Sequence, residues 1–465
     1  MVSLRSMCAP NTGRRQDSLN RMTKALPRLF RNILASPTRV FVSLLLLSAA
    51  AYWPALRQTF IQDDYPNISL ATTWYGAPNE IGLLFNDAIC RSRATSYWEL
   101  WTAWRLFGPH PAGFYAMGIL FHAINCLILF ALLRDTVFRP FAFLTASIFA
   151  IAEGHQEAVM WISAVNELLL FLFGMSAIAC WIRCLKTDEL QQRFAWPWFS
   201  AAIAFYLLAC ISKESAYVFV PLIVLATVPY LKRRPPGENA VWLKLIPFAI
   251  IGLTQMGLVL RTSRTSFRFS DGSFSLSAPV WANWAMSFGA LLWFWGAASL
   301  LVLILLARNR STVVTAALIW MGVCLIPYSF LTYSHRIPSR QTYLASAGAC
   351  LLIAVGLREC LRKLSRTKPA LGVSLVALLV ISNIGFLWIK KHKQFLARAA
   401  PTDQLVSLAK SARSPLWVRC FPYPRGVAED AVHLMLGPAA PRLAWSAEEA
   451  RTIHAGEEFC YADVR

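Results

Sequence analysis

The stretch RVFVSLLLLSAAAYWPALRQTFIQDDYPNI, residues 39–68, joins a long apolar run to two adjacent acids, Asp63 and Asp64. A helix needs about 20 mainly apolar residues to cross a bilayer, so the run predicts a membrane span. The segment before it is strongly basic, and basic segments stay on the cytoplasmic side. We therefore expect Asp63 and Asp64 to emerge at the opposite, extracytoplasmic surface.

Apolar runs of this kind recur along the chain, which is 57% hydrophobic and 15% charged. Soluble domains carry about 25% charged residues, so this composition excludes a soluble globular core. It predicts an all-α polytopic membrane protein with about eleven transmembrane helices. The expected spans are residues 40–57, 112–133, 139–153, 160–182, 196–211, 214–231, 241–260, 281–306, 312–332, 341–357 and 370–389.

The net charge of +21 first suggests either nucleic acid or anionic lipid as a partner. The basic residues gather between the apolar runs, and in this threading they mark the inner turns. This pattern indicates a lipid bilayer and no nucleic acid. Residues 1–38 are then a basic cytoplasmic tail, and the protein is expected in a bacterial inner (plasma) membrane. A cleaved signal peptide is the alternative interpretation of the first run.

The odd number of spans places the C-terminus outside, after a membrane domain of residues 39–390 whose first outer loop covers 58–110. Residues 391–465 predict a small α/β domain, with a strand at LWVRCF and an amphipathic helix at VAEDAVHLML. The chain has eleven cysteines without the spacing of a metal site. Cys420 and Cys460 both fall in this segment, and a disulfide between them is left open.

The same threading puts five polar blocks on the outer side: FIQDDYPN, AEGHQEAVMW, ISKESA, RTSRTSFRFSDGS and YSHRIPSRQTY. Their candidate functional residues are Asp63, Asp64, Glu153, His155, Glu157, Lys213, Glu214, Arg336 and Arg340. Each has a structural alternative: a helix cap for the Asp pair, an interfacial turn around His155, an ion pair at Lys213 and tolerated surface charge for the arginines. His122 and Asn125, inside the second span, are expected to bond between helices.

The blocks GHQEAVMWISAVNELL, LLACISKESAYVFVPLIVL and RQTYLASAGACLLIA, together with the early DD pair, resemble the membrane-embedded glycosyltransferases of the GT-C superfold. Within that group they most resemble relatives of the tetratricopeptide-carrying O-mannosyltransferases, over about residues 40–390. The chain lacks the tetratricopeptide repeats. It also has EGHQEAV and RQTYLAS where the family often has HPVHTEAV and RYLYLPS.

This resemblance implies transfer of a sugar from a polyprenyl-phosphate donor to an acceptor on the outer side, with inversion. Asp63 or Asp64 would be the base, and Lys213, Arg336 and Arg340 would contact the donor phosphate. Glu153, His155, Glu157 and Glu214 would support them. Some relatives use a divalent ion, so Mg²⁺ or Mn²⁺ held by Asp63 and Asp64 stays open. The acceptor, a protein or a glycan, is not indicated.

Two other functions compete with this interpretation. A transporter or flippase for a lipid-linked substrate would place charges near the bilayer midplane and show broken helices in two related halves. A non-catalytic membrane assembly protein would use the outer tail, since a fold alone does not guarantee an active site. The charged candidate residues gather at one membrane interface and not at the midplane, which favours catalysis.

Overall fold

The computed structural model describes residues 28–74, 88–135, 138–191, 194–231, 240–262, 275, 277–306, 311–332 and 339–461. Within these ranges, seven helical stretches are long and apolar enough to cross a membrane. They contain α3 (Pro37–Tyr52), α7 (Pro111–Leu133), α10 (Val165–Gln191), α12 (Phe219–Leu231), α14 (Ile246–Thr262), α16 (Val280–Leu306) and α19 (Pro369–Gly385).

Shorter apolar helices complete the bundle: α8 (Arg139–Ile151), α11 (Trp196–Cys210) and α17 (Ser311–Leu325). A further helix, α18 (Ser346–Thr367), is apolar at its start and basic toward its end. Each predicted span coincides with one of these helices, so the chain is an integral membrane protein with the expected all-α architecture. Length and apolar composition together mark seven of these described helices as full spans.

The first helix shows how the apolar runs are used. Pro37 begins α3, and the buried Val40, Leu44 and Ser48 recur every four residues, which places them on one face of the helix. That face packs on α7 and α8. Pro54 then lies in a 3₁₀ turn, η2 (Trp53–Arg57), that ends the helix just before the acidic pair.

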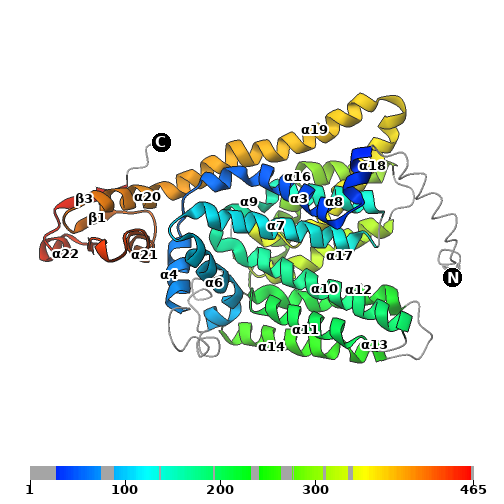
Figure 1. Cartoon of the computed structure of the whole chain (residues 1–465), viewed down its shortest axis with the longest axis horizontal. Coiled ribbons are helices and arrows are strands. Elements are labelled where there is room, and N and C mark those ends of the chain that lie inside the picture. The colour runs from blue at the N-terminus through cyan, green and yellow to red at the C-terminus, as the bar shows by residue number, and fades with distance from the viewer. Residues whose placement is uncertain are drawn as a thin grey trace.

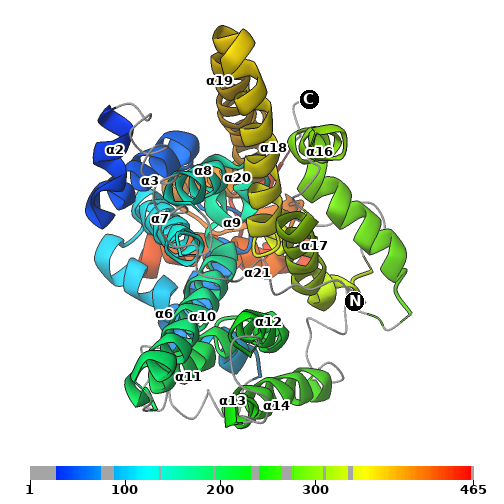
Figure 2. The ribbon, with the colours of Figure 1, turned by 90° about the vertical axis from the view of Figure 1, so that its right-hand side faces the viewer.

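The membrane helices form two groups. Viewed along the bundle in Figure 2, α10, α11, α12 and α14 lie together, and α3, α7, α8 and α18 form the other group with α16 and α17 beside α18. Trp181 of α10 is fully buried in the first group, where its indole nitrogen donates to the Thr227 hydroxyl at 2.8 Å. The neighbouring α13 is short (Ala240–Leu243), as is α2 (Arg28–Leu34) before α3.

The described parts of the first outer loop include two helices, α4 (Asp64–Trp74) and α6 (Ala88–Phe107). The stretch YWELWTAWRLF, residues 97–107, lies in α6. Short turns lie in or next to the second, third and fifth polar blocks: η3 (Glu153–His155), α9 (Gln156–Met160), η4 (Ile162–Ala164), η5 (Glu214–Val218), η6 (Ile326–Tyr328) and η7 (Ser339–Thr342).

The C-terminal segment is joined to the bundle by a continuous helix. After α19 the chain passes through one π-helical turn, η8 (Phe386–Lys391), into α20 (His392–Ser411). No break therefore marks residue 390, where the outer domain was expected to begin. Leu405 and Ala409 of α20 instead belong to the small core of the C-terminal domain, together with Leu416, Val418 and Phe459.

The predicted α/β character of this domain is confirmed. A parallel sheet of order β2-β1-β3 contains β1 (Leu416–Cys420), β2 (Leu443–Ala444) and β3 (Glu457–Cys460), and helices α21 (Arg425–Leu436) and α22 (Ala447–Thr452) connect the strands, with the short turn η9 (Gly437–Ala439) after α21. Cys420 and Cys460 form a disulfide between β1 and β3. Helix α21 packs on α4, which places the domain at the end of the bundle that carries the acidic pair (Figure 1).

Candidate functional site

Four of the five polar blocks meet at one end of the bundle. Asp64 bonds to Ser163 after the second block, and Arg340 of the fifth block bonds to Glu157. Lys213 of the third block bonds to Tyr328, just before the fifth. In the fourth block, residues 263–273 lie outside the described residues. The shared location that the threading predicted therefore holds for the blocks that can be placed.

The structure separates the two neighbouring acids. Asp64, the first residue of α4, is completely buried. One of its carboxylate oxygens accepts hydrogen bonds from the Ser163 backbone N–H at 2.8 Å and the Ser163 hydroxyl at 2.6 Å. The other accepts from the Ile61 N–H at 2.8 Å. Asp64 thus fastens the outer loop to η4 and has a structural role.

Asp63 is exposed. The residue before it, Gln62, has a left-handed φ of 44°, and this turn directs the two acids to different environments. A helix-capping Asp63 would bind the backbone N–H three residues later, but that residue is Pro66, which has none. The Asp63 carboxylate forms no hydrogen bond with any other residue that the structure describes. Of the pair, Asp63 is therefore the acid that a ligand can reach.

Burial gives Asp64 a distinct dependence on pH. Burial raises the pKa of Asp64 from 3.8 to about 7, although its three hydrogen-bond donors oppose the shift. The contribution of Asp64 to stability is therefore fully present below about pH 4 and is lost as pH rises through about 7, a change of about 4 kcal/mol. We expect the melting temperature of the parent to fall between pH 5 and pH 8 relative to that of Asp64→Asn. Melting curves of both proteins that run parallel over this range would contradict the prediction.

Two arginines lie against one aromatic ring close to this turn. The guanidinium carbons of Arg340 and Arg398 are 4.7 Å and 4.4 Å from the centre of the Trp161 ring. Arg398 also donates to the Gln62 side chain at 2.8 Å, so it is tied to the residue before Asp63. Within the described ranges neither guanidinium forms a salt bridge. The cluster of Arg340, Arg398 and Trp161 therefore holds two positive charges without carboxylate partners, which suits an anionic ligand.

Sequence reasoning identified Arg340 but missed Arg398. Arg398 was assigned to the start of the outer domain, whereas it lies on α20, which continues the last membrane helix. The stretch FLARAAP, with one arginine among small apolar residues at a membrane boundary, was the available signal. Arg336, predicted to contact the same phosphate, lies outside the described residues.

The third block forms ion pairs instead of an open cationic site. Lys213 is buried and pairs with Glu167, and its ammonium also donates to the Tyr328 hydroxyl at 3.0 Å. Glu214 binds Arg93 through both carboxylate oxygens, at 2.7 and 3.3 Å. These pairs fit the structural alternative for the block. A contact of Lys213 with donor phosphate remains a prediction that its present partners do not favour.

The acidic and histidine side chains of the second block do not come together in one site. His155 is fully buried and bonds to the Ser346 hydroxyl at 2.6 Å, and burial lowers its pKa well below the usual value. The backbone N–H of Glu153 donates to the Asn383 side chain of α19 at 2.9 Å. Of these three residues, Glu157 is the one bonded to a residue of the arginine cluster, since its carboxylate accepts from the backbone N–H of Arg340 at 3.3 Å. Among these three, a supporting role near Asp63 is therefore open to Glu157 alone.

His122 and Asn125 join helices, as their position inside a span predicted. His122 shares a hydrogen bond with the Tyr343 hydroxyl at 2.7 Å, and Asn125 donates to the same oxygen at 3.2 Å. Asn125 also donates to the Leu168 carbonyl of α10. This buried network connects α7, α10 and the segment before α18.

The acidic pair does not fit a shared divalent ion. Both oxygens of Asp64 already accept hydrogen bonds from Ser163 and Ile61, and Asp63 points to a different environment. Mg²⁺ and Mn²⁺ are bound by carboxylate oxygens that are free to coordinate. Among the described residues, no group of three or more His, Cys, Asp or Glu side chains could hold a metal.

No family model matches the chain. A protein O-mannosyl-transferase of Caenorhabditis elegans is 22% identical over 396 residues, which cover 74% of this chain and 54% of the relative. The chain thus spans about half the length of the curated relative that it matches.

Solved structures share the fold. The archaeal oligosaccharyltransferase of Archaeoglobus fulgidus, in complex with an inhibitory peptide and a dolichol-phosphate, matches 89% of this chain and 65% of its own length, with a TM-score of 0.52 and 12% identity. The crystal structure of an A. fulgidus oligosaccharyltransferase tethered to an acceptor peptide matches 89% of this chain and 64% of its own, with a TM-score of 0.50 and 13% identity. At this identity the likeness establishes the fold.

Proposed function

We propose that this chain, which has the GT-C fold of membrane-embedded glycosyltransferases, transfers a sugar from a polyprenyl-phosphate donor to an acceptor at the polar end of its helix bundle. The observation that carries the proposal is the position of the exposed Asp63, one residue from Gln62, which binds Arg398 of the arginine cluster. The proposal thus places a base next to a phosphate site. The dolichol-phosphate in the archaeal structure supports a lipid phosphate as donor.

The chemistry requires few groups. Asp63 takes the proton of an acceptor hydroxyl or amine, whose oxygen or nitrogen attacks the anomeric carbon from the face opposite the phosphate. The bond between that carbon and the phosphate oxygen breaks, and the lipid phosphate leaves with the electron pair. A phosphate ester needs no general acid to leave, and Arg340 and Arg398 stabilise its charge. The product is inverted at the anomeric carbon.

The location of the site accounts for the remaining catalytic requirement. Asp63 follows the first membrane span directly, at the level where a lipid phosphate would lie. Donor, base and acceptor are then held together at the membrane surface while water is restricted. We place this surface on the extracytoplasmic side, because the basic turns mark the opposite side as cytoplasmic.

The proposal is tested by reconstituting the purified chain in vesicles with labelled polyprenyl-phosphate mannose, polyprenyl-phosphate glucose and membrane extract as a source of acceptors. We expect label to leave the lipid and appear in a protein or glycan fraction. Movement of intact labelled lipid across the vesicle without cleavage would instead identify a transporter. Protein that does neither would identify an assembly role.

The arginine cluster is expected to set donor affinity. We predict that Arg398→Gln and Arg340→Gln each weaken binding of polyprenyl phosphate by about tenfold or more, because each removes a charge-assisted hydrogen bond to phosphate. Equilibrium binding to the detergent-solubilised protein measures this effect. Arg419→Gln is the matched control, since Arg419 lies on the C-terminal sheet and pairs with Glu458. Equal dissociation constants in the parent and both cluster variants would contradict the assignment.

A further inference from the structure

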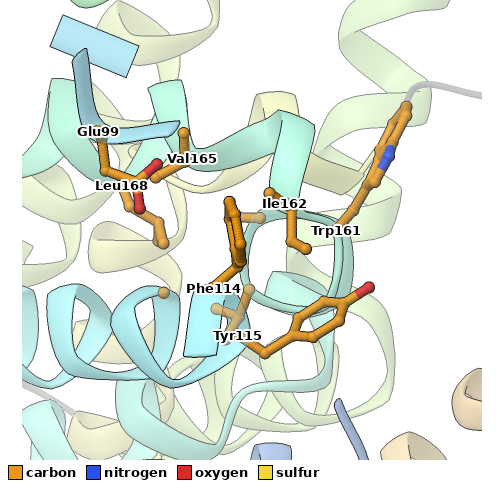
Figure 3. A pocket seen from close by; sticks show the side chains of 10 residues that line it. Glu99, Phe114, Tyr115, Trp161, Ile162, Val165 and Leu168 are labelled. Atoms are coloured by element: carbon orange, nitrogen blue, oxygen red, sulfur yellow. The ribbon is translucent and has the colours of Figure 1, made fainter. Parts of the chain in front are cut away.

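The membrane domain fixes the chain on both sides of the acidic turn, residues 61–64. Before the turn, the Tyr115 hydroxyl donates to the Thr59 carbonyl at 3.0 Å. Tyr115 and Trp161 line the same small cavity, and Figure 3 shows the hydroxyl and the indole ring at one end of it. After the turn, the buried Asp64 carboxylate is anchored by its three donors. The orientation of the two middle residues of the turn depends on other contacts.

Gln62 is the residue of this turn whose backbone is strained. Its φ of 44° lies in the left-handed region, which a residue other than glycine adopts at a cost in free energy. Such a conformation persists where the surrounding contacts hold it. The Gln62 side chain is half-buried, and its oxygen accepts from Arg398 at 2.8 Å. The contacts of this side chain therefore maintain the turn that directs Asp63 away from Asp64.

One further contact of Gln62 comes from the C-terminal domain. Tyr423, between β1 and α21, is half-buried, and its hydroxyl donates to the backbone carbonyl of Arg398 at 2.8 Å. The same hydroxyl shares a hydrogen bond with the Gln62 side chain. Burial raises the pKa of Tyr423, and the bond to Gln62 and the Arg398 charge only partly oppose the rise, so the phenol stays protonated at neutral pH. The hydroxyl thus joins α20 to the turn before Asp63.

The loop that carries Tyr423 is held rigidly. Pro422 and Pro424 flank the tyrosine, and a proline restricts both its own backbone and that of the residue before it. Cys420, three residues earlier, is joined to Cys460 by the disulfide. Helix α21, which follows the loop, packs on α4. A hydroxyl presented by such a loop is suited to fix a side chain in the turn below it.

We propose that Tyr423 is a positioning residue of the site, whose hydroxyl holds the Gln62 side chain and thereby the direction of the Asp63 carboxylate. The inference rests on the proposed function, in which Asp63 is the base. In this role Tyr423 acts through Gln62 and exchanges no proton with the substrates. A base must lie within hydrogen-bond distance of the acceptor, so a small displacement of the turn slows transfer.

The first measurement is the rate of transfer at saturating labelled polyprenyl-phosphate sugar. Tyr423→Phe removes only the hydroxyl, and we expect it to lower this rate about tenfold. In the Asp63→Asn background the same change should lower the rate by less than about twofold, because the turn then carries no base to displace. An equal loss in both backgrounds would show that Tyr423 does not act through Asp63, and would overturn the inference.

Hydrogen exchange detects the state of the turn without any activity. The N–H groups of Asp64 and Tyr65 bond to the carbonyls of Ile61 and Gln62 at 2.9 and 3.3 Å, so their exchange rates measure how often the turn opens. In Tyr423→Phe we expect both amides to exchange about three- to tenfold faster than in the parent, the effect of losing one hydrogen bond. Mass spectrometry of the detergent-solubilised full chain gives these rates.

Tyr461→Phe is the matched control. Tyr461 is the other tyrosine of residues 391–465, and its hydroxyl forms no hydrogen bond with a residue that the structure describes. This variant should leave transfer and exchange unchanged. The melting temperature of Tyr423→Phe should stay within about 3 °C of the parent, because one hydroxyl contributes little to the unfolding free energy of the whole chain. A larger fall would assign Tyr423 to the scaffold and overturn the inference.

The remaining outcomes are also decisive. Unchanged transfer in Tyr423→Phe, or unchanged exchange of the two amides, overturns the positioning role. A parent that transfers no sugar contradicts the proposed function. Faster exchange in Tyr423→Phe then still assigns Tyr423 to the turn, whereas unchanged exchange removes it from the turn.

Discussion

Replacement of Asp63 by Asn should lower the rate of sugar transfer by a factor of about 10² to 10⁴, the usual contribution of a general base. The fold and the donor affinity should stay at parental levels, because the Asp63 side chain is exposed and bonds to no other described residue. The measurement is the initial rate of transfer from labelled polyprenyl-phosphate sugar, together with the melting temperature and the dissociation constant for the lipid.

Asp64→Asn is the matched control for this prediction. Its amide group would face the Ile61 N–H or the Ser163 donors, so we expect a loss of stability of about 1–3 kcal/mol. Compared at equal amounts of folded protein, Asp64→Asn should retain far more activity than Asp63→Asn. Full activity in Asp63→Asn, or a larger loss of transfer in Asp64→Asn, would remove Asp63 from the role of base.

The second large effect is expected at the buried ion pair between Lys213 and Glu167. Their side chains are 8% and 1% exposed, so removing one partner leaves an uncompensated charge in the bundle. Lys213→Met or Glu167→Gln alone should cost about 3–5 kcal/mol of unfolding free energy. The double variant Lys213→Met/Glu167→Leu should recover most of this loss, because apolar side chains of similar volume can replace such a pair.

Unfolding of the purified protein by heat or denaturing detergent measures both effects. Losses that simply add in the double variant would show that the two residues do not act as a pair. The double variant also tests the phosphate contact predicted for Lys213 without the complication of unfolding. If it is stable but binds polyprenyl phosphate about tenfold more weakly, Lys213 belongs to the donor site after all.

The sequence predicted the features that are set locally. Span positions follow from the length of each apolar run, and the strand and helix of the C-terminal domain follow from short hydrophobic patterns. The grouping of the polar blocks followed from counting spans. None of these predictions depended on which helices are in contact.

The site residues depended on contacts that no local pattern contains. Asp63 and Asp64 are adjacent and chemically identical, and what separates them is Ser163, 99 positions away. Lys213 was expected to be available because its partner Glu167 lies 46 positions earlier, in another block. Arg398 becomes a candidate only through Trp161, whose ring it shares with Arg340, 58 positions earlier.

The division of labour between the two acids has an evolutionary consequence. Under the proposed function, a substitution of Asp63 would greatly slow sugar transfer but leave a stable protein, whereas a substitution of Asp64 would lower the amount of folded protein. The proposed activity could then be lost in a single step without loss of the protein. Descendants that kept Asp64 but not Asp63 would be pseudoenzymes, able to survive as binding proteins for the same lipid.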